Sequence, residues 1–587
     1  MRQFSPNVTW AGEYNTINCA AGHHMAEAGW MRNRSVADSY SRWWTTDEAR
    51  HNYYYWWATA ARRVFGRSGD AALLRATVPA YKAQFLQYAR GALPVHNAGF
   101  SAEHDCLWNA PGNEGQEQSL SGPGCRSLVQ SMMYGEAAAL AELCAAIGDD
   151  DGAAEMLEEA ARWQRRVLNL WNGNITAFDT LRMGKPPPAP TPPTPPPPPT
   201  PQPPTPPPTP PPAGFSGPLA GHDGTFCCDQ APCVGGHSKF LFEGAAPRAD
   251  CFAKCAADAR CRFATVHGGG GGGGDWCMNA QWCNATNPFG GEAPGDTSTH
   301  TYAKTADHAA EAAPAPYLGA VALAGVRELA SLTSPWFFGA VPRHNASAYA
   351  GSWDTAFDAE GLGGPHGLRS AEKRAPGYYC DHGCCSWSGP VWPFESAKAI
   401  SAAINVLNNY PTVTTMDGGR FWAMLFDYTA MHTPKWKVMS SRSTFYANLT
   451  ESDVAQFLIE GLGELWVAEN GCGDDQWTRQ PQLGGPAWTD GATEGYRYNH
   501  ATFMDLVLSG VVGLQPAPNG SLTVNPLVPA ATLPWWAADG VALHGKIVSV
   551  VFDADGSHYN KGAGLKVLVN GVTAAASPVL KPLTVQL

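Results

Sequence analysis

The stretch RSLVQSMMYGEAAALAELCAAIGDDDGAAEMLEEAARWQRRVLNLW, residues 126–171, decides the fold of this chain. Its first part, Arg126 to Gly148, carries a long face of Ala, Leu and Met at helical spacing. A second amphipathic segment, Asp151 to Trp171, follows after a short break. Apolar residues that recur every three to four positions predict helices, so the stretch predicts two consecutive helices joined by a short loop.

Similar patterns lie on both sides of this helix pair. Ser35 to Arg67 carries aromatic residues at helical spacing, and the segments 396–409 and 453–469 have the same periodicity. Successive helices joined by short loops with Gly or Pro indicate an array of α-hairpins, because a parallel sheet would need strands between them. The sequence therefore predicts a mainly α fold.

The last part of the chain has a different texture. Three segments alternate or run in β-branched residues, and two dipeptides between them favour hairpin turns. The strands are expected at Leu522–Val524, Ile547–Phe552 and Leu565–Val569, and the turns at Asp555-Gly556 and Asn570-Gly571. We expect a short β-rich unit over residues 516–587.

An insert interrupts the helical pattern. Residues 185–213 are almost entirely Pro with interspersed Thr, which predicts a polyproline II linker because Pro fixes φ and donates no backbone hydrogen bond. Residues 214–304 hold half of the chain's 16 cysteines and predict a small disulfide-rich α+β module. The helical domain should accordingly comprise residues 1–184 and 305–515.

Composition excludes some classes of function. The formal net charge of −12 argues against a nucleic-acid partner, because few cations are available to neutralise phosphates. No apolar run is long enough to span a bilayer. The 22 Trp, 19 Tyr and 22 Phe suit the apolar faces of sugar rings, although large helical cores also use aromatic residues.

The cysteines indicate an oxidising compartment. Their crowding favours disulfides over zinc, because paired Cys-x-x-Cys knuckles and suitably spaced histidines are missing from the sequence of the insert. Sequons support a secreted or lumenal glycoprotein; they begin at Asn7, Asn33, Asn174, Asn284, Asn345, Asn448 and Asn519. The first residues lack the apolar core of a signal peptide, and we expect that the N-terminus is truncated.

Two carboxylates stand out for chemistry. Glu117 lies in a loop near Trp108, and Glu469 follows Leu465-Trp466-Val467-Ala468 in an equally aromatic setting. Hydrolysis of a glycoside needs one carboxylic acid to protonate the leaving group and one carboxylate to activate water or attack the sugar. Most Glu residues are solvated surface groups, so each assignment is a hypothesis.

Several motifs, in order, resemble the six-hairpin glycosidases related to mannosylglycerate hydrolase. They are 7–17, 26–33, 122–126, 131–137, 387–394, 498–506 and 524–527. The resemblance covers nearly the whole chain outside the insert. It implies an (α/α)6 barrel similar to those of trehalases and processing glucosidases, and a glucoside- or mannoside-type substrate.

The resemblance also implies catalytic roles. Glu117, in Glu114-Gly115-Gln116-Glu117, fits the place of the general acid, and Glu469-Asn470 begins the motif of the general base. Residues 471–473 do not continue that motif, so Glu494 is the alternative base. An inverting mechanism is implied, for which the two carboxyl groups should stand roughly 6.5–9.5 Å apart.

Further residues are expected to bind substrate or to set the charge of the site. They are Trp108, Glu114, Arg126, Trp387, Trp392, Tyr498, Asn499 and His500, with Trp44 as a weaker stacking candidate. For each aromatic residue, ordinary helix packing is the alternative, and for His500 a structural histidine is the alternative. Cys380, Cys384 and Cys385 lie beside Asp381 and His382, but disulfides are favoured there, and we expect neither a metal nor a cofactor.

The insert carries a second resemblance. Residues 249–265 hold a Cys-x-x-x-Cys pattern that looks like an apple/PAN module, a class that binds proteins or carbohydrates. This resemblance suggests a tether to a wall or matrix glycan. The alternative for the whole chain is a catalytically inactive carbohydrate-binding or extracellular-matrix protein on the same barrel, and a lyase or epimerase is a third possibility.

Overall fold

The computed structural model describes residues 18–46, 53–89, 98–183, 321–364, 367–378, 387–389, 391–431 and 502–587, together with short strands between 215 and 304. Contacts divide the chain into two units, residues 1–182 with 321–587, and residues 183–320. The finer division of the insert into a linker and a module remains a prediction.

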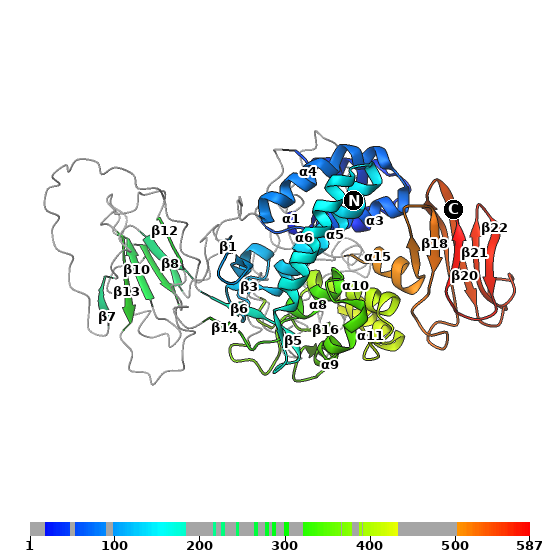
Figure 1. The fold of residues 1–587 in the computed structure, drawn as a ribbon. Coiled ribbons are helices and arrows are strands. Elements are labelled where there is room, and N and C mark those ends of the chain that lie inside the picture. The colour runs from blue at the N-terminus through cyan, green and yellow to red at the C-terminus, as the bar shows by residue number, and fades with distance from the viewer. Residues whose placement is uncertain are drawn as a thin grey trace. The chain divides into compact units, whose positions relative to one another are not determined.

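The first unit is mainly helical, which confirms the predicted fold class (Figure 1). Its helices are α1 Asn18–Ala28, α2 Ser35–Trp43, α3 Trp57–Ser68, α4 Ala71–Ala89, α5 Ser127–Ile147, α6 Asp150–Leu168, α8 Leu329–Phe337, α9 Gly351–Ala356, α10 Pro393–Asn409, α11 Gly418–Met431 and α15 Met504–Leu506. Side chains from α1 to α11 share one hydrophobic core. No helix in the described part is long and apolar enough to cross a membrane.

Helices α5 and α6 confirm the helix pair predicted from residues 126–171, and they lie side by side (Figure 1). α5 is buried over most of its surface, whereas α6 buries one stripe that includes Met156, Ala160 and Trp163. The turn between them is fixed by Asp149, whose side chain accepts a hydrogen bond of 2.9 Å from Gly152 N and caps α6. Local capping and one-sided burial together explain why this stretch folds as a hairpin.

The helical pattern over residues 35–67 is divided in the structure. α2 ends at Trp43, and α3 begins at Trp57. The hydroxyls of Thr45 and Thr46 donate to the last carbonyls of α2, which offers the backbone an alternative to another helical turn. Trp44 is 0% exposed and packs on Trp57 at 4.8 Å between ring centroids, which are contacts of a core aromatic; its weaker candidacy as a sugar platform remains a prediction.

A buried charge cluster joins the N-terminal helices to the C-terminal helix of this unit. Asp505 of α15 is bonded by Arg67, by Arg63 at 3.1 Å and by Trp30 Nε1 at 2.8 Å. We call Arg63, Arg67 and Asp505 the seam cluster. Nearby, Glu27 of α1 accepts hydrogen bonds from the backbone N–H groups of residues 503–505. These contacts hold together segments that lie more than 400 residues apart in sequence.

A small antiparallel sheet lies in the same unit, with the strand order β1-β2-β3-β6-β14. Its strands are β1 Ala98–Ser101, β2 Cys106–Asn109, β3 Gly124–Arg126, β6 Thr180–Arg182 and β14 Ala322–Leu323. A disulfide links Cys106 to Cys125 across β2 and β3. Arg182 pairs with Ala322, so the chain leaves for the insert and returns from it at neighbouring positions on one sheet edge.

The second unit contains antiparallel strands. A five-stranded sheet has the order β7-β13-β10-β11-β9, with β7 Phe215–Pro218, β13 Thr299–Lys304, β10 Phe263–His267, β11 Trp276–Ala280 and β9 Phe242–Ala245. Strands β8 Thr225–Cys228 and β12 Ala285–Pro288 form a separate pair. The segment Cys251 to Cys255, which carries the apple-like pattern, lies outside the described residues.

The C-terminal β-rich unit is confirmed. It has a three-stranded sheet of β17 Leu514–Pro516, β18 Ser521–Val524 and β23 Leu583–Gln586, and a four-stranded sheet of β19 Trp535–Leu543, β20 Lys546–Asp553, β21 Gly564–Val569 and β22 Val572–Ser577. The predicted turn at Asn570-Gly571 joins β21 to β22, with φ of 50° and 82°. Positive φ at both central positions matches the twist of the flanking strands, which explains the Asn-Gly dipeptide.

Candidate active site

Glu117 lies on the connection between β2 and β3. This connection begins with a short 3-10 helix, Pro111–Glu114, and passes through Gly115 in the left-handed region at φ 75°. The Glu117 side chain is half-buried. The disulfide between Cys106 and Cys125 encloses the whole connection, so the loop that carries Glu117 is anchored covalently at its base.

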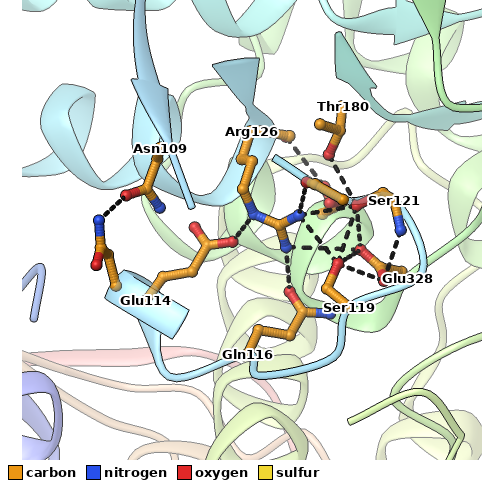
Figure 2. Close-up of polar contacts among 12 residues, drawn as sticks. Asn109, Glu114, Gln116, Ser119, Ser121, Arg126, Thr180 and Glu328 are labelled. Atoms are coloured by element: carbon orange, nitrogen blue, oxygen red, sulfur yellow. Dashed lines mark hydrogen bonds and ion pairs between the residues drawn. The ribbon is translucent and has the colours of Figure 1, made fainter. Parts of the chain in front are cut away.

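Arg126 is the hub of the polar groups behind this loop (Figure 2). Its Nε donates to Glu114, and its Nη2 donates to Gln116 Oε1 at 2.8 Å. Its Nη1 donates to the hydroxyls of Ser119 and Ser121, both at 2.9 Å. A guanidinium offers five donors in one plane, which allows one side chain to fix several points of a loop.

A second carboxylate approaches the same loop from another part of the chain. Glu328, the residue before α8, accepts hydrogen bonds from the hydroxyls of Ser119 and Ser121 at 2.6–2.8 Å. Its Oε2 lies 3.6 Å from Arg126 Nη2. We call Glu114, Arg126 and Glu328 the loop cluster; all three side chains are 0% exposed.

The loop cluster holds two carboxyl groups against one guanidinium. Burial raises the pKa of Glu114 to about 7, although Arg126 opposes the shift, and the neighbouring Glu328 raises the pKa further. One oxygen of Glu114, Oε2, is buried and has no hydrogen-bond partner in the part of the chain that the structure describes. Glu114 therefore takes up a proton near neutral pH.

The structure brings two of the predicted aromatic residues to the Glu117 loop. Trp387 N donates to the backbone carbonyl of Glu117 at 2.9 Å. A Cβ at Gly115 would lie 3.6 Å from the indole ring of Trp392, an ordinary van der Waals distance, so Gly115 lies against this ring and it is the φ of 75° that favours glycine here. The two Trp rings stack at 4.6 Å with an interplanar angle of 12°.

The burial of these rings bears on their expected role. Trp387 and Trp392 are each 3% exposed, and they form a small cluster with Phe394. Phe394 in turn contacts His23 of α1 at 4.7 Å between ring centroids. These contacts are what packing aromatics make. The stacking of Trp387 or Trp392 on a sugar remains a prediction.

The other predicted site residues have different positions. Trp108 is 5% exposed on β2, where it pairs with Gly99 and Cys125. Glu114 and Arg126 bond each other inside the protein, and a direct role for either in substrate binding remains a prediction. Six predicted features lie outside the described residues: Glu469, Glu494, Tyr498, Asn499, His500 and the group Cys380 to Cys385.

Sequence reasoning missed Glu328 of the loop cluster and the two serines that bond to it. Ser119 and Ser121 lie within five residues of Glu117 and are short polar residues in an apolar neighbourhood, which is a usable signal. Glu328 gave no signal, because it lies beyond the insert and has no motif around it. The structure shows no group of three or more His, Cys, Asp or Glu suited to a metal among the residues it describes.

Comparisons with known proteins agree with this architecture. The family described as the mannosylglycerate hydrolase MGH1-like glycoside hydrolase domain matches residues 13–193 and 296–442, which together make up more than half of the 587 residues. The unmatched stretch between these ranges falls within the insert. Among curated proteins, none matches this chain.

A solved structure entitled "Sialidase" resembles the chain with a TM-score of 0.62 and 20% sequence identity. The alignment covers 98% of this chain and 37% of that protein, so this chain spans well under half of the length of that protein. At this identity the likeness concerns the fold alone. The extent of the family match decides the classification: the chain belongs to the MGH1-like glycoside hydrolase family.

Proposed function

We propose that the chain hydrolyses a glucoside- or mannoside-type substrate with inversion, with Glu117 as the general acid and Glu469 as the general base. The observation that carries this proposal is the anchoring of the Glu117 loop. A disulfide closes its base, and Arg126 fixes it at several points from inside the protein. Proton donation requires a carboxyl group held within a few tenths of an ångström of the glycosidic oxygen, and an anchored loop meets that need.

The proposed base follows from the sequence. Glu469-Asn470 begins the family's motif, and Glu494 is the substitute because residues 471–473 depart from that motif. In an inverting mechanism the base activates water on the face of the sugar opposite the acid. The base needs hydrogen-bond donors that keep it charged, and the candidates are Asn499, His500 and Arg126. Arg126 is committed to the loop cluster, which leaves Asn499 and His500.

The test compares Glu117→Gln with the matched control Glu103→Gln on aryl α- and β-glucosides, aryl mannosides and disaccharides. Glu103 lies on the neighbouring turn between β1 and β2, and its side chain is 85% exposed. Loss of the acid should lower kcat on disaccharides about 100-fold or more, while the control keeps wild-type kcat. Equal activity of Glu117→Gln and wild type on disaccharides would remove Glu117 from the mechanism.

The base and the stereochemistry have their own measurements. Glu469→Gln should abolish turnover of every substrate, whereas Glu494→Gln should keep it; the reverse pattern assigns the base to Glu494. Proton NMR of the first product should show the anomer opposite to that of the substrate. Retention of configuration would contradict the inverting mechanism.

One observation favours a second function. The segment after Glu469-Asn470 reads Gly471-Cys472-Gly473 and departs from the family's pattern. A barrel that has lost its base would bind carbohydrate without turnover. Wild-type protein that binds the disaccharides by calorimetry but hydrolyses no substrate in the panel would establish this binding function.

The insert and the compartment complete the proposal. The apple-like pattern of residues 249–265 supports a tether to a wall or matrix glycan, and the cysteines and sequons support a secreted or lumenal glycoprotein. Expression in a eukaryotic secretory host, followed by glycosidase treatment and mass spectrometry, measures sequon occupancy. Unmodified Asn174 and Asn345 would contradict the glycoprotein assignment.

A further inference from the structure

Glu328 lies at the start of α8 and has an unusual place for its side chain. A residue at this N-cap position usually accepts a hydrogen bond from its own helix. Glu328 makes no such bond, and its backbone is extended at φ −122° and ψ 141°. Its carboxylate points instead at the loop that carries Glu117 (Figure 2).

Among the residues that the structure describes, two serines of that loop supply the hydrogen bonds to the Glu328 carboxylate. Ser119 Oγ donates at 2.7 and 2.8 Å, and Ser121 donates through Oγ at 2.6 Å and through its backbone N at 3.2 Å. Ser119 is two residues beyond Glu117 in sequence. The Glu328 carboxylate is therefore hydrogen-bonded to the loop immediately after the proposed acid, Glu117.

The direction of these hydrogen bonds is fixed by chemistry. Arg126 Nη1 has only donors, so both serine oxygens accept from it. Each serine has one proton, which it then donates to Glu328. Thr180 Oγ1 lies 3.0 Å from Ser121 Oγ and reinforces the same order. A carboxylate is the group that suits this place, because it accepts at every lone pair and donates at none.

We propose that Glu328 is a positioning residue for the general acid: acting through Ser119 and Ser121, it holds the Glu117 carboxyl in the geometry for proton transfer. The inference rests on the proposed role of Glu117. Glu328 lies 207 residues beyond Ser121, in the part of the helical unit that follows the insert. The inference therefore gives that part of the chain a role in positioning the general acid.

The kinetic signature of this role differs from that of a merely structural residue. A misplaced acid slows only the departure of leaving groups that need a proton. Dinitrophenyl glycosides release a stable phenolate and need little protonation, whereas disaccharides and methyl glycosides need it strongly. A structural defect lowers turnover of both classes by the same factor.

The test is Glu328→Gln, with Glu372→Gln as the matched control. Glu372 is also a buried carboxylate at 4% exposure near the start of α8, but its hydrogen bonds come from Arg327, whose Nη1 lies at 2.7 Å, and not from the Glu117 loop. The amide of Glu328→Gln places an N–H group against the donors of Ser119 and Ser121, so part of the hydrogen bonding between Glu328 and the loop is lost. We expect kcat on disaccharides to fall about 10-fold or more, kcat on dinitrophenyl glycosides to change less than about 3-fold, and KM to stay within about 3-fold.

Two further variants keep the proposal falsifiable if Glu328→Gln folds poorly. Ser119→Ala removes the hydrogen bonds from one of the two serines to Glu328. It should show the same dependence on the leaving group, with a smaller loss of kcat. Glu328→Asp keeps the charge and should recover part of the lost kcat. Thermal unfolding measured on every variant separates folding defects from kinetic ones.

The outcomes separate the two proposals. If Glu117→Gln shows the leaving-group dependence and Glu328→Gln does not, the positioning role is wrong and the acid assignment stands. If Glu117→Gln has no effect, the acid assignment itself fails. Equal losses on both substrate classes, or the same losses in Glu372→Gln, would also overturn the positioning role.

Discussion

Two buried charge clusters in the helical unit use the same residue types in opposite proportions. The seam cluster sets two guanidiniums, those of Arg63 and Arg67, against the single carboxylate of Asp505. The loop cluster sets one guanidinium, that of Arg126, against two carboxyl groups. The side chains of Arg67, Asp505 and the whole loop cluster are almost completely removed from solvent, whereas the Arg63 side chain is 25% exposed. The clearest difference between the two clusters is their charge balance.

The two balances give opposite pKa directions. Burial alone would raise the pKa of Asp505, but Arg67 and Arg63, with hydrogen bonds from Trp30 and Ser509, outweigh it, and the pKa is lowered. In the loop cluster burial prevails and raises the pKa of Glu114 to about 7. The carboxylate of the seam cluster is thus held ionised, whereas Glu114 of the loop cluster changes its protonation near neutral pH.

The largest effect is expected at the seam. Asp505→Asn leaves the buried guanidinium of Arg67 without its carboxylate, and breaking a buried ion pair typically costs about 3–5 kcal/mol. We expect the free energy of unfolding in urea to fall by that amount, while kcat per folded molecule on a disaccharide stays unchanged. A large loss of kcat with little loss of stability would show that the seam, too, serves catalysis.

The second effect concerns the covalent anchor of the Glu117 loop. Cys106 and Cys125 are 19 residues apart, and a disulfide that closes a loop of this size contributes about 3 kcal/mol by restricting the unfolded chain. The double variant Cys106→Ser with Cys125→Ser should lose about that much stability. Because the loop cluster still fixes the loop from inside, we expect kcat to fall less than about 3-fold; a larger fall would make the disulfide, and not Arg126, the main support of the acid.

The third effect separates the clusters by pH. The pKa of Glu114 is raised from 4.5 to about 7, so the folded protein binds a proton that the unfolded chain has already released. Its contribution to stability is complete below pH 4.5 and is lost as the pH rises through 7. At about 1.4 kcal/mol for each pKa unit, the rise from 4.5 to about 7 corresponds to a total loss of roughly 3–4 kcal/mol, of which roughly 2–3 kcal/mol falls between pH 5 and pH 8.

Glu114→Gln should therefore reduce the decline of stability between pH 5 and pH 8, measured by urea unfolding at both values. Burial raises the pKa of Glu136 to about 7 as well, so the Glu114→Gln variant retains part of the decline through Glu136. Asp505→Asn should shift both measurements equally, because the lowered pKa of Asp505 keeps it ionised throughout this range. A pH slope that is identical in Glu114→Gln and wild type would contradict the proton assignment.

The contrast also shows what sequence can predict. The helix pair over residues 126–171 and the turn at Asn570-Gly571 depend on local periodicity and local φ preferences, and the structure confirms both. Glu114 and Arg126 were singled out because they lie beside Glu117 in a recognisable motif. Their mutual ion pair was not predicted, because it depends on the fold of the connecting loop.

Other contacts had no local signal at all. Glu328 reaches Ser119 across 209 residues, and Asp505 reaches Arg67 across 438. Nothing in the composition around Glu328 marks it, since its role arises only when β14 pairs with β6 and brings the start of α8 to the Glu117 loop. Long-range polar contacts of this kind are set by topology, and periodicity does not contain that information.

The smallest effect is expected from removal of the insert. Replacing residues 183–321 by an Asn-Gly turn joins Arg182 to Ala322, which are already paired neighbours in the sheet. We expect the free energy of unfolding of the helical unit to change by about 1 kcal/mol or less, because the two ends of the excised segment already lie next to each other. The contacts of the seam cluster should not change when the insert is removed, because its residues lie on α3 and α15.

The loop cluster is the sensitive side of that experiment. Arg182 Nε donates to the carbonyl of Ser121 at 2.8 Å, and Thr180 donates to the hydroxyl of Ser121, so the strand that leads into the insert also touches the Glu117 loop. If the pairing of β6 with β14 is enough to hold that strand, kcat on disaccharides and on dinitrophenyl glycosides will both remain at wild-type level. A selective loss of kcat on disaccharides would mean that the insert itself helps to position Glu117. The loop cluster would then not be sufficient to hold the acid, and the insert would have to be counted as a further support of the Glu117 loop.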